Sequence, residues 1–210
     1  LSGGGGIDDD GLPGGGGGGS GGELSGGGID DDGVPGSVIS YPPPKDADDI
    51  ISGVTPALVS DLSTELIEMG AKIVLLKLGY HGVHMKSSGF ESLKLLGRAT
   101  PKNLESWADQ ELWSPCYQVE VVGTTGSGDA TIAGFLSGFL RDLSPIETVD
   151  ASVAVGACNV EAADALSGLL SWDEVLNRIA DGWKKHQMVD LPLEGKWNRE
   201  HQVWILNHRD

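Results

Sequence analysis

Residues 121–130 read Val-Val-Gly-Thr-Thr-Gly-Ser-Gly-Asp-Ala, a stretch that joins the end of an apolar run to a glycine-rich turn and an acidic residue. The apolar run 119–122 predicts a buried strand. The three glycines among residues 123–128 predict a tight turn, and residues 130–140 have the apolar spacing of a helix. The first N–H groups of a helix have no partner within it, and the helix dipole favours negative charge there. We therefore expect an anion site where the turn meets the helix.

Asp129 ends the glycine turn, at a place where a phosphate-binding loop more often carries lysine or serine. A carboxylate beside a phosphate site can accept the proton of an attacking hydroxyl. The amides of Gly126, Ser127 and Gly128 can stabilise the charge on a transferring phosphate, and glycines allow the backbone to approach it closely. The residues indicate phosphoryl transfer to a hydroxyl; a purely structural strand–helix turn is the alternative.

Other glycine motifs do not match this stretch. A Walker loop needs Lys followed by Ser or Thr after its last glycine, whereas Asp129 and Ala130 stand there. A dinucleotide-binding fingerprint needs glycine or alanine at Thr131. A hydrolase nucleophile elbow centred on Ser127 needs glycine at Thr125. The sequence therefore argues against these three classes of site.

The composition divides the chain into two parts. Residues 1–50 hold 18 of the 33 glycines and 10 of the 31 acidic residues, and the segment 1–14 returns, one glycine shorter, as 24–36. Such a segment buries little apolar surface, so we expect a low-complexity linker, or a stretch that is not natural continuous sequence, followed by a folded part at 51–210. A calcium-binding interaction protein is a further alternative. It is disfavoured because calcium-binding repeats need an aliphatic residue where Asp10 and Asp32 stand.

Charge and cysteine content exclude several classes of function. The net charge of −17 argues against nucleic-acid binding and against an anionic membrane surface. The chain has neither an apolar run of membrane-spanning length nor a signal-peptide pattern. Its two cysteines, Cys116 and Cys158, lie far apart in apolar surroundings, which fits buried free thiols in a reducing compartment. We therefore expect a cytoplasmic protein.

Strand-like and helix-like segments alternate in the folded part. Apolar spacing and capping residues predict helices at 55–70, 130–140, 144–163 and 171–185, and strands at 71–78, 83–86 and 203–206. This alternation favours an α/β domain with a largely parallel sheet.

Several histidine and aromatic side chains are expected to have structural rather than functional roles. His81 and His84 have no Cys or carboxylate at ligand spacing, so we expect exposed strand residues rather than a metal site. Trp172 and Trp183 are expected on one face of one helix, packed in the core. Residues 90–118 predict no clear element, but their large apolar side chains should be buried; these are Trp107, Leu112, Trp113 and Tyr117.

The segment from Gly123 to Asp129, with Ala133-Gly134-Phe135 after it, resembles the C-terminal signature of the ribokinase-like (PfkB) carbohydrate kinases. The resemblance extends back to residues 74–83 and forward through residues 154–159 to Gly168. It implies a ribokinase-like three-layer α/β/α sandwich with a central, largely parallel sheet. The β lid that covers the sugar in this family is not identifiable in the sequence.

The resemblance also implies roles for individual residues. Asp129 matches the catalytic base, and Gly126, Ser127 and Gly128 match the anion hole. Positions beside the nucleotide or near it are Lys77, Gly79, Gly82, Thr124, Thr125, Asn159 and Gly168. The implied reaction is ATP-dependent phosphorylation of a sugar or nucleoside-like hydroxyl, with Mg²⁺ on the phosphates. The resemblance is also compatible with a homodimer.

Two departures from the family pattern support an alternative. Gly123 stands where many members carry an aspartate that helps to bind a monovalent cation, so no such cation site, and no protein metal ligand, is assigned. The family's Asn-x-x-Glu motif, linked to magnesium and phosphate, is not found before residue 71. A nucleotide-binding module of the same fold without kinase activity is therefore the second hypothesis.

Overall fold

The computed structural model describes residues 54–188 and 194–206; the low-complexity segment 1–50 and its repeats lie outside them. The helices are α1 (Pro56–Glu68), α2 (Phe90–Leu93), α3 (Leu104–Trp107), α4 (Ser127–Leu140), α5 (Pro145–Asn159) and α6 (Trp172–Ala180). The strands are β1 (Ile73–Lys77), β2 (Val83–Ser87), β3 (Glu111–Ser114), β4 (Gly195–Asn198) and β5 (Val203–Leu206). Two 3₁₀ helices, η2 (Gly79–His81) and η3 (Lys94–Ala99), complete the described elements.

Local capping chemistry accounts for where the long helices begin. The Thr55 hydroxyl accepts a hydrogen bond from Leu58 N at 3.2 Å, which confirms the predicted start of α1. Ser144 and Ser171 each form a capping box with the glutamate three residues later, at the predicted starts of α5 and α6. However, α6 ends at Ala180, so the expectation that Trp183 lies on this helix is wrong.

The sheet corrects the expected strand direction. Its order is β1-β2-β3-β5-β4, and every neighbouring pair is antiparallel. A parallel pair needs a crossover of about a dozen residues or more, whereas only residues 78–82 join β1 to β2. The expectation of a largely parallel sheet is therefore wrong for the described strands. The fold is an α/β arrangement with a five-stranded antiparallel sheet.

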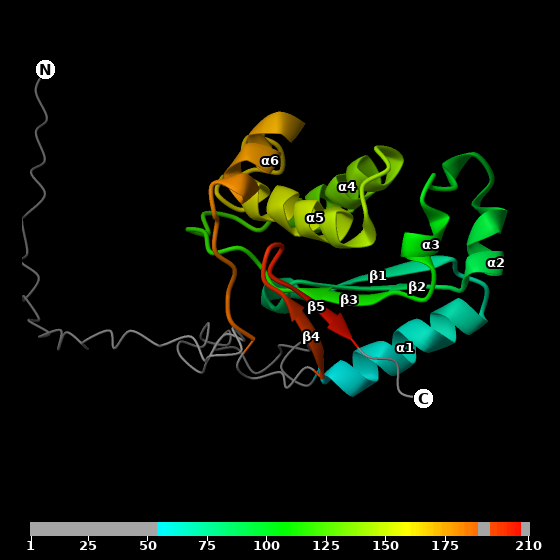
Figure 1. Cartoon of the computed structure of the whole chain (residues 1–210). Helices are drawn as coiled ribbons and strands as arrows, with labels where there is room; N and C mark the ends of the chain where they lie inside the picture. The colour runs from blue at the N-terminus through cyan, green and yellow to red at the C-terminus, as the bar shows by residue number, and fades with distance from the viewer. Residues whose placement is uncertain (1–53, 189–193, 207–210) are drawn as a thin grey trace, which may run out of the picture.

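Helices cover both faces of this sheet, with α1 on one side and α4 and α5 on the other (Figure 1). Side chains of successive strand residues point to opposite faces, so the sequence alternates between two environments. Met85 of β2 and Leu112 of β3 pack with Phe135 of α4 and with other apolar side chains on that side. Trp113 of β3 packs with Val59 of α1 on the other side.

Helices α4 and α5 approach each other closely because glycine occupies the contact. A Cβ atom on Gly134 would lie 2.9 Å from the Val155 Cβ and 3.0 Å from the Ser152 Cα. A Cβ atom on Gly138 would lie 3.2 Å from Thr148 Cα. A bulky side chain at either glycine would therefore push the two helices apart.

His84 is fully buried in β2, so the expectation of an exposed strand residue is wrong; His81 is buried too. The His84 ring lies between Ser63 Oγ of α1, 3.2 Å from Nδ1, and Glu111 Oε1 of β3, 3.0 Å from Nε2. Lys86 Nζ lies 2.9 Å from the other Glu111 oxygen. Burial by itself raises the pKa of the Glu111 carboxyl, but the bonds with His84 and Lys86 outweigh burial and lower the pKa to about 2.

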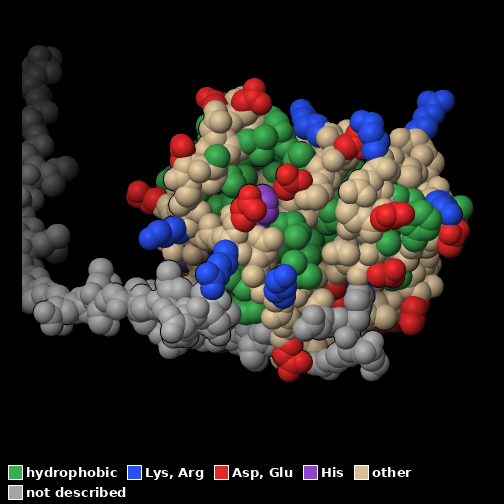
Figure 2. Space-filling view, in the orientation of Figure 1, with side chains coloured by type: hydrophobic (Ala, Val, Ile, Leu, Met, Phe, Trp, Pro, Cys, Tyr) green, Lys and Arg blue, Asp and Glu red, His purple; other side chains and the backbone are tan. Residues whose placement is uncertain are grey.

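The stretch without a clear sequence pattern supplies part of the core. Trp107, Leu112, Trp113 and Tyr117 are all at most 1% exposed, as predicted, although strand β3 itself was not predicted. On the face shown in Figure 2, acidic and basic side chains are both spread over the surface, with apolar side chains between them. Within the described ranges, no helix combines the length and apolar character that crossing a membrane requires.

Replacing Gly134 with valine should lower the free energy of unfolding by about 1–3 kcal/mol, because the new side chain overpacks the α4–α5 contact. Ala133→Val is the matched control: the same residue type is introduced on the same turn, but Ala133 is exposed. The control should lower the free energy of unfolding only by the difference in helix propensity between alanine and valine, which is roughly a few tenths of a kcal/mol. Urea unfolding of both variants measures the difference, and equal losses would contradict the packing explanation.

Candidate functional site

The glycine turn is held against a second loop that follows α5. Gly126, the N-cap of α4, has a φ of +79°, which favours glycine. A Cβ atom there would also lie 2.8 Å from the Ala165 Cβ, and one on Gly123 would lie 2.9 Å from Ala162 O. Both glycines are therefore required by close contact with residues 162–165.

The expected strand before this turn is not formed. Residues 119–122 are irregular rather than part of the sheet, and Val121 and Val122 are 46% and 58% exposed. The Val122 N–H donates to Val160 O at 2.8 Å, so this segment is bonded to the end of α5 instead of to a strand. The prediction of a buried strand is wrong here.

The N-terminus of α4 is open to an anion. No side chain caps the helix, and its first turn contains Ser127, Gly128 and the exposed carboxylate of Asp129. The leading N–H groups of a 14-residue helix have no partner inside it and carry partial positive charge, although the Ser127 N–H donates to Thr124 O of the turn at 3.3 Å. This arrangement places anion-binding amides next to a carboxylate that solvent or a substrate can reach.

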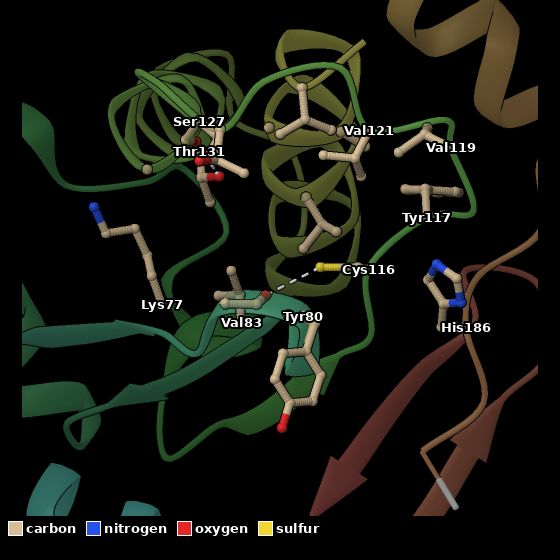
Figure 3. A pocket seen from close by; sticks show the side chains of 18 residues that line it. Lys77, Tyr80, Val83, Cys116, Tyr117, Val119, Val121, Ser127, Thr131 and His186 are labelled. Carbon is tan, nitrogen blue, oxygen red and sulfur yellow. Dashed lines mark hydrogen bonds between the residues drawn. The ribbon is translucent and has the colours of Figure 1, made fainter. Parts of the chain in front are cut away.

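A cavity of about 370 Å³ lies beside this helix end. Its walls come from the end of β1 and the turn after it, from Val83 of β2, from parts of the segment 116–131, from α5 and from His186. Lys77, Ser127 and Thr131 lie toward one end, whereas Tyr117, Val119 and His186 lie toward the other (Figure 3). Most of the lining is apolar between these polar groups. Its size and character are typical of small-molecule sites, which measure roughly 300–1,000 Å³.

The structure brings together most of the residues that the sequence singled out. Six of them line the cavity, namely Lys77, Gly79, Gly82, Thr124, Ser127 and Gly128. Gly126, Thr125 and Asp129 are their chain neighbours but do not line the cavity themselves. Two segments separated by more than forty residues in the printed sequence thus meet at one cavity, as the sequence hypothesis requires.

Asn159 and Gly168 lie behind the glycine turn, outside the cavity lining. The Asn159 side-chain amide donates to Ala165 O at 2.7 Å, which holds the loop that touches Gly126. A Cβ atom on Gly168 would lie 2.4 Å from Cys158 O. In this structure both residues position the loop that supports the turn, rather than forming a wall of the cavity.

Several cavity residues carried no sequence signal. Cys116, Tyr117 and His186 line the cavity, although no motif includes them, and Tyr80 lines it from within the resembling segment 74–83 without having been assigned a role. The Cys116 thiol donates to Gly79 O at 3.3 Å, and burial raises the pKa of that thiol to about 11. Cys116 is half-buried and Cys158 is buried, and both are free thiols. In the sequence, only the apolar character of residues 116–122 could have suggested that this segment forms a wall of the cavity.

A buried charge cluster supports the wall that contains Tyr117. The Tyr117 hydroxyl donates to Asp150 of α5, and Lys185 Nζ lies 2.8 Å from the same carboxylate. Lys185 also donates to Ser114 Oγ and to His201 O, which ties β3 and the chain before β5 to this point. Burial lowers the pKa of Lys185, while Asp150 opposes that change.

Asp150 completes the cluster through His201. Its second oxygen lies 2.9 Å from His201 Nδ1. This hydrogen bond raises the pKa of His201 above its usual 6.5, and the nearby Glu147 and Glu200 carboxylates act in the same direction. Trp183 stacks on Tyr117 with ring centroids 4.2 Å apart, on the same side of the domain. The buried hydrogen bonds and ion pairs of this cluster therefore hold the cavity wall at Tyr117 in place, in addition to apolar packing.

Among the described residues, no three His, Cys, Asp or Glu side chains gather in a way that could hold a metal ion. No acidic residue lines the cavity either; Asp129 is the carboxylate next to it in the chain. The residues present therefore do not fit a protein-built Mg²⁺ site. Mg²⁺ is often carried on substrate phosphates with few protein ligands.

The sequence matches a family model described as "pfkB family carbohydrate kinase" over residues 46–172. It is 28% identical over 137 residues to an ATP-dependent 6-phosphofructokinase of Thermoanaerobacterium thermosaccharolyticum, covering 65% of this chain and 35% of the relative. It is 28% identical over 133 residues to a 2-dehydro-3-deoxygluconokinase of Bacillus subtilis, covering 63% of this chain and 34% of the relative. The chain thus spans about one third of the length of these relatives.

Solved structures also match this chain, at lower sequence identity than these two relatives. The ribokinase of Thermotoga maritima matches with a TM-score of 0.44 and 24% identity, over 58% of this chain and 34% of that one. Phosphofructokinase-2 of Escherichia coli matches with a TM-score of 0.43 and 21% identity, over 59% of this chain and 33% of that one.

The His201–Asp150 pair should make stability depend on pH. Because folding raises the pKa of His201 above 6.5, the pair stabilises the fold fully below that pH, and the stabilisation is lost as the pH rises through the folded pKa. The free energy of unfolding should therefore fall above about pH 6.5 in the unaltered chain. His201→Gln should flatten this fall, as measured by urea unfolding between pH 6 and pH 9. A fall of the same size in both proteins would show that another group is responsible.

Proposed function

Because this chain belongs to the pfkB family of carbohydrate kinases, we propose that it takes part in transferring phosphate from ATP to a hydroxyl of a sugar or a similar alcohol. The observation that carries this proposal is the cavity that ends at the N-terminus of α4, with Asp129 in the first turn. Phosphoryl transfer needs anion-binding groups and an acceptor for the proton of the attacking hydroxyl. This end of the cavity offers both.

Asp129 is proposed as the general base. Its carboxylate takes the proton of the acceptor hydroxyl while the hydroxyl oxygen forms a bond to the terminal phosphorus of ATP. The bond from that phosphorus to the bridging oxygen breaks, and ADP leaves with the bonding electrons.

The amides at the start of α4 are proposed to stabilise the phosphate during transfer. Gly126, Ser127 and Gly128 supply backbone that can come close to phosphate oxygens, and charge on those oxygens grows as the bond to ADP breaks. The apolar part of the cavity, toward Tyr117 and Val119, is proposed to hold the nucleoside. Thr124, Gly79 and Gly82 line the same cavity, and ATP brings Mg²⁺ on its phosphates.

We propose a class of acceptor compound rather than a single sugar. The relatives are named for 6-phosphofructokinase and 2-dehydro-3-deoxygluconokinase activities, which share an alcohol group on a small, polar sugar derivative as acceptor. Since this chain spans about one third of those relatives, the complete activity is itself part of the proposal. The ribokinase-like three-layer sandwich is part of the same proposal.

Asp129→Asn in the full-length protein should lower sugar-dependent ADP formation by about 10²–10⁴-fold, because the amide cannot accept the proton. ATP binding should be retained, since the amides of α4 are unchanged. Asp173→Asn is the matched control, because Asp173 is also an exposed acidic residue in the first turn of a helix. A coupled ADP assay measures turnover, and calorimetry measures binding.

Three outcomes of this experiment are informative. Unchanged turnover in Asp129→Asn would overturn the assigned base. ATP binding by the unaltered protein without transfer to any of a panel of sugars would favour the second hypothesis, a nucleotide-binding module without kinase activity. Loss of turnover in Asp173→Asn as well would show that the effect is not specific to Asp129.

Turnover should not depend on a monovalent cation held at residue 123. The position of Gly123 leaves no room for a carboxylate side chain, because its Cβ would already lie 2.9 Å from a backbone oxygen. ADP formation at equal ionic strength should therefore be the same with potassium as with tetramethylammonium. A requirement for potassium would contradict this expectation and would indicate cation ligands elsewhere.

A further inference from the structure

Residues 160–165, the loop that follows α5, support the glycine turn from one side. Val160 O accepts a hydrogen bond from Val122 N at 2.8 Å. Further along, the loop touches the turn so closely that a Cβ atom on Gly126 would lie 2.8 Å from the Ala165 Cβ. The position of this loop therefore sets the position of the turn, and with it the N-cap of α4.

An ion pair ties this loop to α6. Both terminal nitrogens of the Arg178 guanidinium donate to the Glu161 carboxylate, one to each oxygen, and Nη2 lies 2.7 Å from Oε1. Such a two-point pair fixes the relative orientation of its partners as well as their distance. Helix α6 is itself anchored, because Val175 lies in the same buried apolar cluster as Ala154 and Ala157 of α5. The loop is therefore tied to a helix that is packed in place.

The same guanidinium contacts the support of the opposite end of the cavity. Its Cζ atom lies 3.7 Å from the centre of the Trp183 ring, which stacks in turn on Tyr117 of the cavity wall. Trp183 Nε1 also donates to Gln118 O at 2.9 Å. A cation over the face of a tryptophan ring is attracted to it. Arg178 thus contacts both the support of the glycine turn and the support of the aromatic wall.

The ion pair matters more for alignment than for stability. Arg178 and Glu161 are 32% and 33% exposed, and pairs exposed to this degree contribute little to the free energy of unfolding because solvent screens them. Neither side chain lines the cavity, so neither is placed to touch a ligand there. The alignment of reacting groups is far more sensitive, since a displacement of about 1 Å can lower a rate about a hundredfold.

We propose that Arg178 is a positioning residue for phosphoryl transfer, and this inference rests on the function proposed above. Through Glu161 it holds the loop 160–165, and hence the glycine turn, in the alignment that the amides of α4 need to bind the transferring phosphate. Arg178 lies beyond residue 172, where the family match ends, so that match assigns it no role.

Arg178→Gln in the full-length protein should lower kcat for sugar-dependent ADP formation about tenfold to a hundredfold. The KM for ATP should change much less, because the loss falls on the transition state rather than on ground-state binding. Glu161→Gln should have an effect of similar size, and the double variant should be no worse than Arg178→Gln, because the two side chains act through each other. Arg178→Lys keeps the charge without the paired donors and should restore part of the activity. A coupled ADP assay measures both constants.

Lys102→Gln is the matched control. It removes an ion pair with Asp142, which follows the C-terminal end of α4, the end away from the glycine turn. Its kcat and KM should equal those of the unaltered protein. Urea unfolding of every variant should show only a small loss of stability, which separates a positioning role from general destabilisation.

Amide hydrogen exchange reports on the loop without any substrate. The Val122 and Gly123 N–H groups both donate to Val160 O, so their exchange depends on the position of the loop. These two amides should exchange faster in Arg178→Gln than in the unaltered protein and should be unchanged in Lys102→Gln. Nuclear magnetic resonance measures the exchange of each amide separately.

The outcomes separate this proposal from the proposed function. Unchanged kcat in Arg178→Gln, with normal turnover by the unaltered protein, would overturn the positioning role and leave the proposed function in place. A loss in Arg178→Gln that Glu161→Gln does not share would also overturn it, because the effect would then come from the contact with Trp183. If the unaltered protein forms no ADP with any sugar, the proposed function fails and the positioning role fails with it.

Discussion

Close packing of α4 against α5 is the contact on which the rest of the site depends. Gly134 and Gly138 let the two helix backbones approach, and Gly156 leaves room for the Thr131 hydroxyl, which would lie 2.2 Å from a Cβ atom there. Thr131 donates to Ser127 O, so the same contact stabilises the first turn of α4. The position of the anion-binding end of α4 is thus set by helix packing and not only by the turn before it.

Buried polar clusters hold the layers around this helix pair. Glu111 with His84 and Lys86 joins two strands and α1, while Asp150 with Lys185, Tyr117 and His201 joins α5 to the chain on either side of residues 189–193. Removing one partner of such a pair leaves a buried charge uncompensated, which is strongly destabilising. Tyr117 also lines the cavity, so the second cluster connects the stability of the domain with the shape of the site.

Local sequence predicted much of the helical part of the fold and failed for the sheet. The starts of α1, α5 and α6 follow from Thr55, Ser144 and Ser171, because capping is a contact between residues three apart. Strand direction depends on which distant segments pair. The alternation of elements therefore suggested parallel strands, whereas the described strands are all antiparallel. The same reason explains His84, whose partners are 21 and 27 residues away.

The sequence by itself predicted the residues that are proposed to form the phosphate end of the candidate site. The glycines of residues 123–128, the carboxylate of Asp129 and the resemblance to a kinase signature are all local properties of the sequence, and the family match agrees with the resemblance. Only the tertiary structure decided that Lys77 meets Gly128, that Tyr117 and His186 form the far wall, and that Asn159 supports the turn from behind. These relations join residues far apart in the chain, and they exist only because the sheet and the α4–α5 pair bring the segments together.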